Sequence, residues 1–443
     1  MMRKVLILGA LCLCGLTARG QYPGWEAPLA ASVGCATLRH EFVSYTTRQD
    51  AEAGDRLRAV YYKEIALQPT GRGVYVGQAD LQFRWRGQQV FLRVEGLPQA
   101  KVSFNGHEAG MVQDSRVFSE IDVTQLIVEG RNTLTLTAEE GYGALMETIP
   151  GARATVLRAA LMGQPVVRVE DYAIEGRYDA AAGSGTLHVA VSLHNAASGD
   201  ESFELGYDIF SSESKLIHYD LRGVTLKGGA RDTLRFEVKI RSFTAADVWR
   251  VGSPKLFRGT MYIKYGGRNV EYVPYTVGFV SDGAGWDAIR GAVPSKCVRF
   301  NAEPTRQATE KRLTELRRGG TTLLCVDYPQ PVWFYDLCDR VGMMVVDQAN
   351  VNAGERIGDR NIDGALSNDP RLVELFVRRV LAQQKRVAGH PCIVAWSLGG
   401  DCGVGYNMYM AYLALKAADG RLPVLYRGAG GEWNNDLPFA FPR

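Results

Sequence analysis

The sequence predicts a multidomain β plus α/β protein in which two β-sandwiches precede a parallel α/β domain. Between residues 56 and 280, short stretches alternate apolar and polar residues and are separated by turn residues, which is typical of sandwich strands. After Gly285, continuous apolar strands alternate with helical patterns, which indicates parallel βαβ units. The length of 443 residues fits two to four domains.

The composition is that of an ordinary globular protein. Hydrophobic residues make up 46% and charged residues 22%, which excludes a disordered chain, a collagen-like fibre and a coiled coil. The formal net charge is +3, and Arg3, Lys4 and Arg19 account for it. Because the rest of the chain is balanced, no basic surface is expected to attract nucleic acid or anionic lipid.

Residues 1–20 predict a signal peptide. Residues 1–4 are basic, residues 5–14 are apolar, and residues 18–20 offer the small side chains that a signal peptidase reads. The apolar run is shorter than the ~20 residues that span a bilayer. The alternatives are a buried N-terminal strand and a lipid-modified Cys14. We therefore expect an exported protein, periplasmic or at the cell surface of a Gram-negative bacterium, without a membrane span.

The cysteine pattern says little about function or disulfide pairing. No C-x-x-C pair is present, so nothing indicates a zinc site or a thioredoxin-like centre. Export permits disulfides, but apolar surroundings favour buried free thiols. The six cysteines beyond the leader are Cys35, Cys297, Cys325, Cys338, Cys392 and Cys402.

Residues 21–160 are expected to form a jelly-roll-like β-sandwich, and residues 161–281 an Ig-like one. In the first, residues 132–137 alternate with period two, and Asn105-Gly106 is a strong hairpin-turn signal. In the second, residues 186–193 alternate in the same way. The whole series holds too many strands for one sandwich, and the seam is expected between residues 141 and 160.

Residues 282–443 are expected to form an incomplete (β/α) TIM-type barrel. Gly285 to Arg443 comprises 159 residues, whereas a closed eight-stranded barrel takes about 250. That is enough for about five strands. The predicted helices are 308–318, 331–341, 371–388 and 406–418, and the predicted strands are 321–326, 343–346, 392–396 and 423–426.

This domain order, together with several motifs, resembles glycoside hydrolase family 2, which includes bacterial β-galactosidases and β-glucuronidases. The most specific motif is HPCIVAWSLG at residues 390–399, close to the family's "H-P-S-I-x-x-W-S-L-G-N-E". The segments that also resemble family motifs are 102–106, 118–124, 130–134, 249–256 and 337–347. The resemblance implies a retaining β-glycosidase framework, here degenerate and C-terminally truncated.

The resemblance breaks at the positions that carry the chemistry. Asp401 stands where the family has its Glu acid/base, and Gly400 where an Asn holds the sugar 2-hydroxyl. The shorter Asp carboxyl sits over 1 Å back, a displacement that can cost ~100-fold in rate. Gln348 replaces a carboxylate, and Asp327 replaces a His. The family's first-strand motif corresponds by letters to residues 290–294.

The second carboxylate is the larger problem. Retaining hydrolysis needs a nucleophile about 5–5.5 Å from the acid/base. In the family this residue follows a later barrel strand, and Glu432 matches no nucleophile motif. We therefore expect no complete catalytic pair.

The remaining polar residues give candidates for binding. Asp327, Asp347 and Asp401 are each expected after a strand, at the end of the barrel where ligands bind. Three acids there fit a divalent cation, but solvated or helix-capping carboxylates explain them as well, so we expect no metal and no cofactor. The ligand-binding candidates are Asp327, Gln348, Trp396 and Gly400, beside the degenerate acid/base position Asp401.

Three functions remain open from the sequence. The favoured one is an exported, non-catalytic protein that binds a glycan or an envelope protein. The alternative is an active β-glycosidase that uses Asp401 as acid/base with a nucleophile from another chain, and the third is a remnant of a longer gene. The sugar, the linkage and the partner stay open, as does the disulfide pairing.

An open half-barrel predicts a covering partner. Its inner face and the edge of its last strand would expose apolar surface and unpaired backbone groups. Either the tail 428–443 folds back over this face or a second chain covers it. Because sixteen residues are few for the task, self-association or a protein partner is expected.

Overall fold

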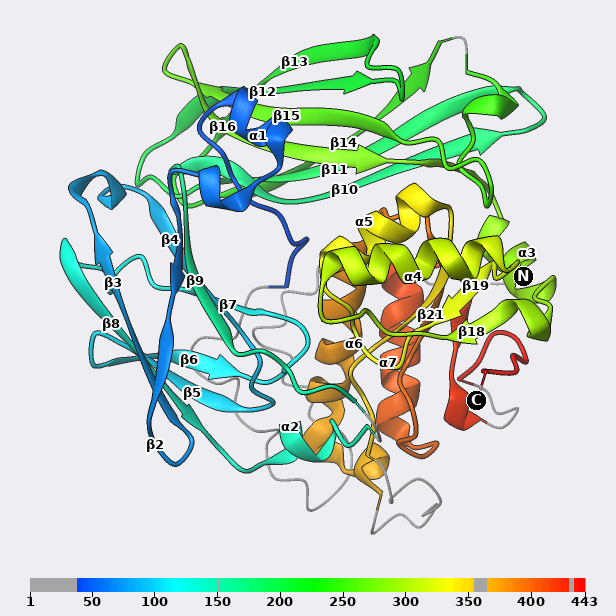
Figure 1. The fold of residues 1–443 in the computed structure, drawn as a ribbon. Helices are drawn as coiled ribbons and strands as arrows, with labels where there is room; N and C mark the ends of the chain where they lie inside the picture. The colour runs from blue at the N-terminus through cyan, green and yellow to red at the C-terminus, as the bar shows by residue number, and fades with distance from the viewer. Residues whose placement is uncertain (1–37, 150–151, 242, 354–364, 430–433, 443) are drawn as a thin grey trace, which may run out of the picture.

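A computed structural model of the protein describes residues 38–149, 152–241, 243–353, 365–429 and 434–442. The expected leader 1–20, Cys35 and Glu432 lie outside these residues. Two β-sandwiches and an α/β unit follow one another along the chain (Figure 1). The fold class predicted from the sequence is confirmed.

The first sandwich packs a four-stranded sheet on a five-stranded one. Leu92 of one sheet and Leu134 and Leu136 of the other are fully buried in its core, as their period-two spacing predicts. The four-stranded sheet has the order β1(Tyr62–Ile65), β9(Arg158–Gln164), β4(Gln89–Glu95), β7(Ser119–Asp122). The other has the order β2(Leu67–Gly71), β3(Val74–Leu81), β8(Gly130–Ala138), β5(Ala100–Phe104), β6(His107–Val112).

The hairpin between β5 and β6 turns where the sequence predicts it. Asn105 has a φ of 52° and Gly106 a φ of 82°, both in the left-handed region that this tight turn requires. The Asn105 side chain also fixes the turn to its neighbours, since its Oδ1 accepts from Thr133 N at 2.8 Å.

The second sandwich has two four-stranded sheets. Its core contains Val191, Leu205 and Ile263, all without exposed surface. One sheet has the order β14(Arg231–Ile240), β11(Ser184–Asn195), β10(Val167–Asp179), β17(Phe279–Ser281). The other has the order β13(Leu216–Leu226), β12(Glu201–Phe210), β15(Phe257–Tyr265), β16(Arg268–Val277).

The α/β unit contains five parallel strands, as expected. They are, in spatial order, β18(Cys297–Arg299), β19(Leu323–Cys325), β20(Met344–Gln348), β21(Ile393–Ser397) and β22(Val424–Leu425). Its helices are α3(Ala284–Arg290), α4(Arg306–Arg318), α5(Val332–Val341), α6(Val373–Val387) and α7(Tyr406–Ala418). The short helices elsewhere are α1(Arg48–Ala53) and α2(Tyr142–Leu145).

One strand assignment is wrong. Residues 290–294, expected in the first strand, end helix α3 and form the turn after it. The first strand is β18, which has only three residues and therefore no periodic pattern to reveal it. Phe300 and Asn301 consequently follow the first strand, at the end of the sheet that carries the candidate site.

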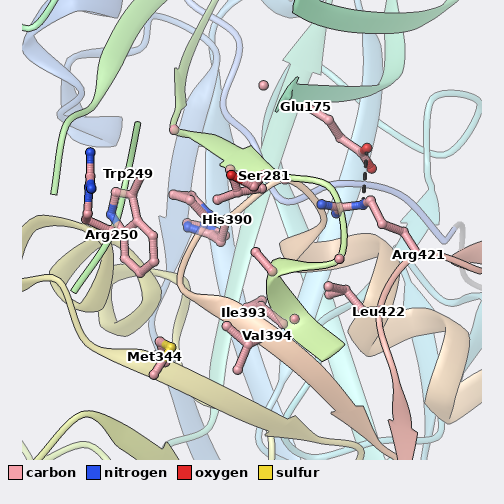
Figure 2. Close-up of a pocket in the computed structure, with 18 of the residues that line it drawn as sticks. Glu175, Trp249, Arg250, Ser281, Met344, His390, Ile393, Val394, Arg421 and Leu422 are labelled. Carbon is pink, nitrogen blue, oxygen red and sulfur yellow. Dashed lines mark ion pairs between the residues drawn. The ribbon is translucent and has the colours of Figure 1, made fainter. Parts of the chain in front are cut away.

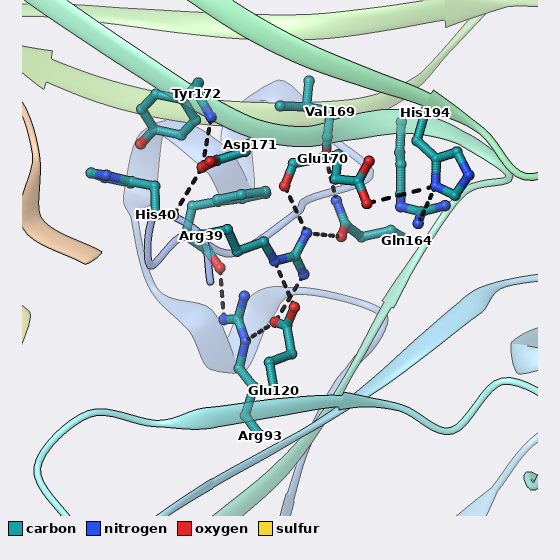
Figure 3. A network of polar contacts seen from close by, with 12 residues as sticks. Arg39, His40, Arg93, Glu120, Gln164, Val169, Glu170, Asp171, Tyr172 and His194 are labelled. Atoms are coloured by element: carbon teal, nitrogen blue, oxygen red, sulfur yellow. Dashed lines mark hydrogen bonds and ion pairs between the residues drawn. The ribbon is translucent and has the colours of Figure 1, made fainter. Parts of the chain in front are cut away.

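Buried ion pairs join the N-terminal segment to the first sandwich (Figure 3). Arg39 Nε lies 2.6 Å from one Glu120 oxygen, and Arg93 Nε lies 2.7 Å from the other. Burial alone would raise the pKa of Glu120, but the two guanidinium groups hold it below its usual value. Arg39 also donates to Gln164 Oε1 and to the Glu170 carbonyl, so this network reaches the second sandwich.

Two predictions from composition can be compared with the described residues. Cys325, Cys338, Cys392 and Cys402 are buried free thiols, and Cys297 is a half-buried one. None of the described helices is long and apolar enough to cross a membrane.

Candidate functional site

The candidate site lies at the carboxyl ends of the five parallel strands. Parallel strands end on the same side of a sheet, so residues that follow β18, β19 and β21 meet there. The sequence candidates Asp327 and Asp401 both fall in these segments. Asp347 lies within β20 itself, and its carboxylate bonds to residues of α5 and α6 on the outer face.

Asp327 is held by an ion pair. Arg299 Nε lies 2.7 Å from both carboxylate oxygens of Asp327, and Asn301 Nδ2 donates to Oδ2 at 2.6 Å. The Asp327 side chain is 7% exposed, whereas the Arg299 side chain is 39% exposed. This carboxylate is therefore compensated within the chain and fixes the ends of β18 and β19 to one another.

Both polar groups of the Gln348 side chain are also hydrogen-bonded within the chain. Its Nε2 donates to the Asp327 carbonyl oxygen, and its Oε1 accepts from Ser397 Oγ at 3.4 Å. Gln348 and Ser397 are each 2% exposed. A primary amide in this position transfers no proton at neutral pH, so Gln348 can only donate or accept hydrogen bonds.

Asp347 is buried between two helices. Tyr335 Oη donates to its Oδ1 at 2.6 Å, and Gln383 Nε2 donates to its Oδ2 at 2.5 Å. Burial raises the pKa of Asp347 to about 6, although these hydrogen bonds lower it. Its contacts place it behind the sheet, away from the strand ends.

Asp401 differs from both other acids. It is half-buried, and no described residue donates a hydrogen bond to its carboxylate. Its backbone carbonyl accepts from Ala353 N at 2.9 Å, which fixes the loop after β21. Its carboxylate therefore differs from those of Asp327 and Asp347, which accept hydrogen bonds from described side chains.

The space beside Gly400 is occupied by a side chain from a neighbouring loop. A Cβ atom at position 400 would lie 2.7 Å from Asn352 Nδ2, and the Gly400 N–H donates to the Val351 carbonyl at 2.9 Å. Asn352 thus occupies the space that a side chain at position 400 would need. A side-chain amide remains beside Asp401, but it comes from the segment after β20.

Trp396 does not line the strand ends. Its indole packs in the core between the sheet and the outer helices, 4% exposed. Its Nε1 donates to Asp419 Oδ2 at 2.9 Å, just beyond the end of α7. The Trp396 contacts are those of a core residue.

The opposite end of the sheet holds a cavity (Figure 2) and, beside it, a different cluster of polar side chains. A cavity of about 150 Å³ lies where β20 and β21 begin, between the α/β unit and the second sandwich, and His390 lines it. His390 Nδ1 lies 2.6 Å from Asp339 Oδ2, and Cys392 N donates to Asp339 Oδ1 at 2.9 Å. Burial lowers the pKa of His390, but Asp339 outweighs this effect and raises it overall.

These three side chains are the described residues whose donor set best fits a metal. Their ligand atoms lie within 4.8 Å of one another. However, the carboxylate already binds the imidazole and the Cys392 amide, and Cys392 Sγ contacts the Tyr335 carbonyl at 3.7 Å. These contacts explain the cluster as a structural connection between α5 and the segment before β21.

The inner face of the sheet is partly covered by the chain itself. Cys325, Val346 and Leu425 form its buried apolar cluster. Leu437, Phe439 and Phe441 of the segment 434–442 pack against it, which is one of the two arrangements expected from the sequence. Coverage by a second chain stays a prediction.

Three residues of the site, Arg299, Asn301 and Asn352, were missed by the sequence reasoning. Asn301 was hidden by the wrong first strand, although it directly follows the apolar residue Phe300. Asn352 follows β20 in the stretch Asn350-Val351-Asn352, where two amides after a strand are a usable signal. Its contact with Gly400 is visible only in three dimensions.

Comparisons with known proteins agree with this architecture. The family model "Glycosyl hydrolases family 2, TIM barrel domain" matches residues 320–437. This part of the chain is therefore similar to the TIM-barrel domain of glycoside hydrolase family 2. A β-galactosidase of Vibrio cholerae is 26% identical over 356 residues, covering 74% of this chain and 33% of that protein. One of Aeromonas hydrophila is 29% identical over 394 residues, covering 83% and 37%.

Solved structures of the family share the fold. A β-glucuronidase of Bacteroides uniformis superposes with a TM-score of 0.62 at 15% identity, covering 80% of this chain and 46% of that one. A β-glucuronidase of Parabacteroides merdae gives 0.63 at 13% identity, covering 80% and 49%. The chain spans about a third of the length of the curated β-galactosidases that it matches.

Proposed function

We propose that this chain is not a glycosidase on its own and that it binds a glycan at the carboxyl ends of its strands. The observation that carries this is the unequal state of the site's acids. Asp327 is compensated by Arg299, and Asp347 is buried behind the sheet. Asp401 is the acid of the three whose carboxylate has no described hydrogen-bond donor.

The chemistry of retaining hydrolysis supports the non-catalytic half. One carboxyl must donate a proton while a second carboxylate attacks the anomeric carbon. Asp327 would have to leave its ion pair to serve as either, and Gln348 can serve as neither. A single free carboxylate can still accept hydrogen bonds from sugar hydroxyl groups.

The position of Asn352 supports the binding half. Its amide lies beside Gly400, next to Asp401. Asn352 has an interaction of its own within the chain, and its amide together with the Asp401 carboxylate forms a small group of convergent polar side chains at the strand ends, of the kind that fixes a ligand's orientation. The β-galactosidase and β-glucuronidase relatives suggest a β-galactoside or a β-glucuronide as the glycan.

Activity and binding are measured with the same three proteins. They are the wild type, Asp401→Asn, and Asp80→Asn as a matched control, because Asp80 is an exposed Asp in β3 of the first sandwich. On aryl β-galactosides and β-glucuronides we expect no turnover above buffer. On immobilised glycans we expect wild-type binding to weaken at least about tenfold in Asp401→Asn and to be unchanged in Asp80→Asn.

Two results would contradict the proposal. Turnover that Asp401→Asn abolishes would establish the alternative, a β-glycosidase with Asp401 as acid/base and a nucleophile from another chain. Absence of binding to every glycan would remove the binding half and leave an envelope protein partner as the function.

Export through the segment 1–20 also remains a proposal. Mass spectrometry of protein from cells tests it, because an intact Met1 N-terminus would show that no leader is removed. Periplasmic or surface localisation depends on the same result.

A further inference from the structure

Strand β13 is an unpaired edge of the second sandwich. It is the first strand of its sheet and bonds to β12 on one side, and no described strand bonds to its other side. Figure 1 shows it along the outer border of this sandwich, away from the α/β unit. Eleven residues long, it offers an extended row of backbone donors and acceptors.

Other edges of this sandwich are protected. Along β16, Tyr272 exchanges backbone hydrogen bonds with Tyr45, and helix α1 packs nearby. Strand β14 carries charged residues through most of its length, with the sequence RDTLRFEVKI. Strand β13 instead exposes Tyr219 by 72% and Leu221 by 40%. Apolar side chains beside free backbone groups are typical of a strand that pairs with another chain.

The sequence of β13 is complementary to itself in one register. Antiparallel pairing about Leu221 places Asp220 of each copy opposite Arg222 of the other. It also places Tyr219 opposite Gly223, where no atom lies within 4 Å of a Cβ position, so the ring has room. Opposite charges and an aromatic ring over a glycine are both favourable cross-strand pairs.

The same charges disfavour the neighbouring registers. Sliding one copy along the other by two residues places Asp220 opposite Asp220 in one direction and Arg222 opposite Arg222 in the other. Like charges directly opposite one another are destabilising. A lone charge on an edge strand prevents pairing, whereas this pair of opposite charges selects one partner and one register.

We propose that β13 pairs with β13 of a second copy of this chain, antiparallel about Leu221, and forms a symmetric dimer with a continuous sheet. Within one chain Arg222 Nε lies 3.0 Å from Asp220 Oδ2, and both side chains are about 40% exposed. They can therefore reach across to a second copy, and Tyr207 Oη, which donates to Asp220 Oδ2 at 3.5 Å, keeps a contact with His218 Nε2 at 3.3 Å. The contact is one strand wide, so the dimer belongs to the weak, concentration-dependent class.

Charge reversal tests the register. In the variant Asp220→Arg, arginines face arginines, and in Arg222→Asp, aspartates face aspartates. Each dimer contains two such contacts, so we expect each variant alone to dimerise at least about tenfold more weakly than the wild type. Sedimentation velocity over about a hundredfold range of concentration measures this difference.

The decisive experiment mixes the two variants. Positions 220 and 222 are then both arginine in one chain and both aspartate in the other, so every facing pair is again opposite in charge. The mixture is therefore expected to dimerise as the wild type does. This arm also controls for folding, because Arg222 lies 3.9 Å from the Phe236 ring and its replacement could disturb the strand. A misfolded variant would not regain dimerisation on mixing.

Three outcomes would overturn the proposal. They are a wild type that is monomeric throughout, single variants that dimerise like the wild type, and a mixture no better than its components. If both charge-reversal variants dimerise as strongly as the wild type, the chain associates through another surface, such as the half-barrel.

Discussion

The two ends of the parallel sheet differ in what their charged groups do. At the amino end, His390 and the Cys392 amide both bond to Asp339, and His390 lines the cavity beside the second sandwich. At the carboxyl end, Asp327 bonds to Arg299 while Asp401 has no described donor. The amino end matches the family motifs and the carboxyl end departs from them. The sequence motifs therefore predict that the framework is retained at the end that contacts the second sandwich and altered at the end where the candidate site lies.

The largest effect is expected from removing the carboxylate at the amino end. Asp339 is 3% exposed, and Asp339→Ala leaves His390 and the Cys392 amide without their acceptor. Breaking a buried pair in this way costs about 3–5 kcal/mol. Urea unfolding should show this loss, whereas Asp401→Ala should change stability by less than about 0.5 kcal/mol.

The pH dependence of this loss follows from the raised pKa of His390. The pair stabilises the fold fully below the ordinary imidazole value of about 6.5, and this contribution is lost as the pH rises through the higher folded pKa. The Asp339→Ala penalty should therefore shrink at alkaline pH. Equal penalties at the two ends of the sheet would refute the contrast between them.

A smaller effect is expected at Asp347, which lies between the two ends. Its folded pKa of about 6 is above the unfolded value of 3.8. The unfolded chain therefore loses this proton first, and stability falls as the pH rises from 4 to 6. A shift of this size corresponds to about 2–3 kcal/mol.

The variant Asp347→Asn isolates this contribution. Asparagine does not titrate, so the stability of the variant relative to the wild type should rise between pH 4 and pH 6.5. Thermal or urea unfolding at several pH values measures the difference, in which the other titrating groups cancel. Parallel stability curves for the two proteins would show that Asp347 ionises normally in the fold.

The sequence predicted the fold well because periodicity reports burial directly. Helix 406–418 was expected with its observed bounds, since helical spacing is a local pattern. Strand β18 was missed, since three residues carry no period. The Arg299–Asp327 pair was hidden in turn, because Arg299 could not be placed at the end of a strand that had not been identified.

The site residues illustrate the same limit. The resemblance to family motifs predicted which positions differ from the family, including Gly400 and Gln348. They did not show how the altered site is filled, because that depends on contacts between separate loops. The approach of Asn352 to Gly400 and the turn of Trp396 toward α7 are of this kind.

The smallest expected effect tests how the carboxyl end was rebuilt. A methyl group at position 400 would lie 2.7 Å from Asn352 Nδ2, so Gly400→Ala must displace that amide. Since the displaced atom is the end of a side chain, the cost should be near the lower limit for overpacking, about 1 kcal/mol. In the Asn352→Ala background the methyl group has room, and the same substitution should be neutral or slightly stabilising.

A double-mutant cycle measured by urea unfolding gives the coupling directly. We expect about 1 kcal/mol or more between positions 400 and 352. Gly399→Ala is the matched control, because a Cβ there would meet the Val351 carbonyl oxygen at 2.3 Å. That oxygen belongs to the backbone, so Asn352→Ala cannot relieve the clash. If both glycine substitutions cost the same in either background, Asn352 does not fill the space at Gly400, and the amide beside Asp401 must be sought in another residue.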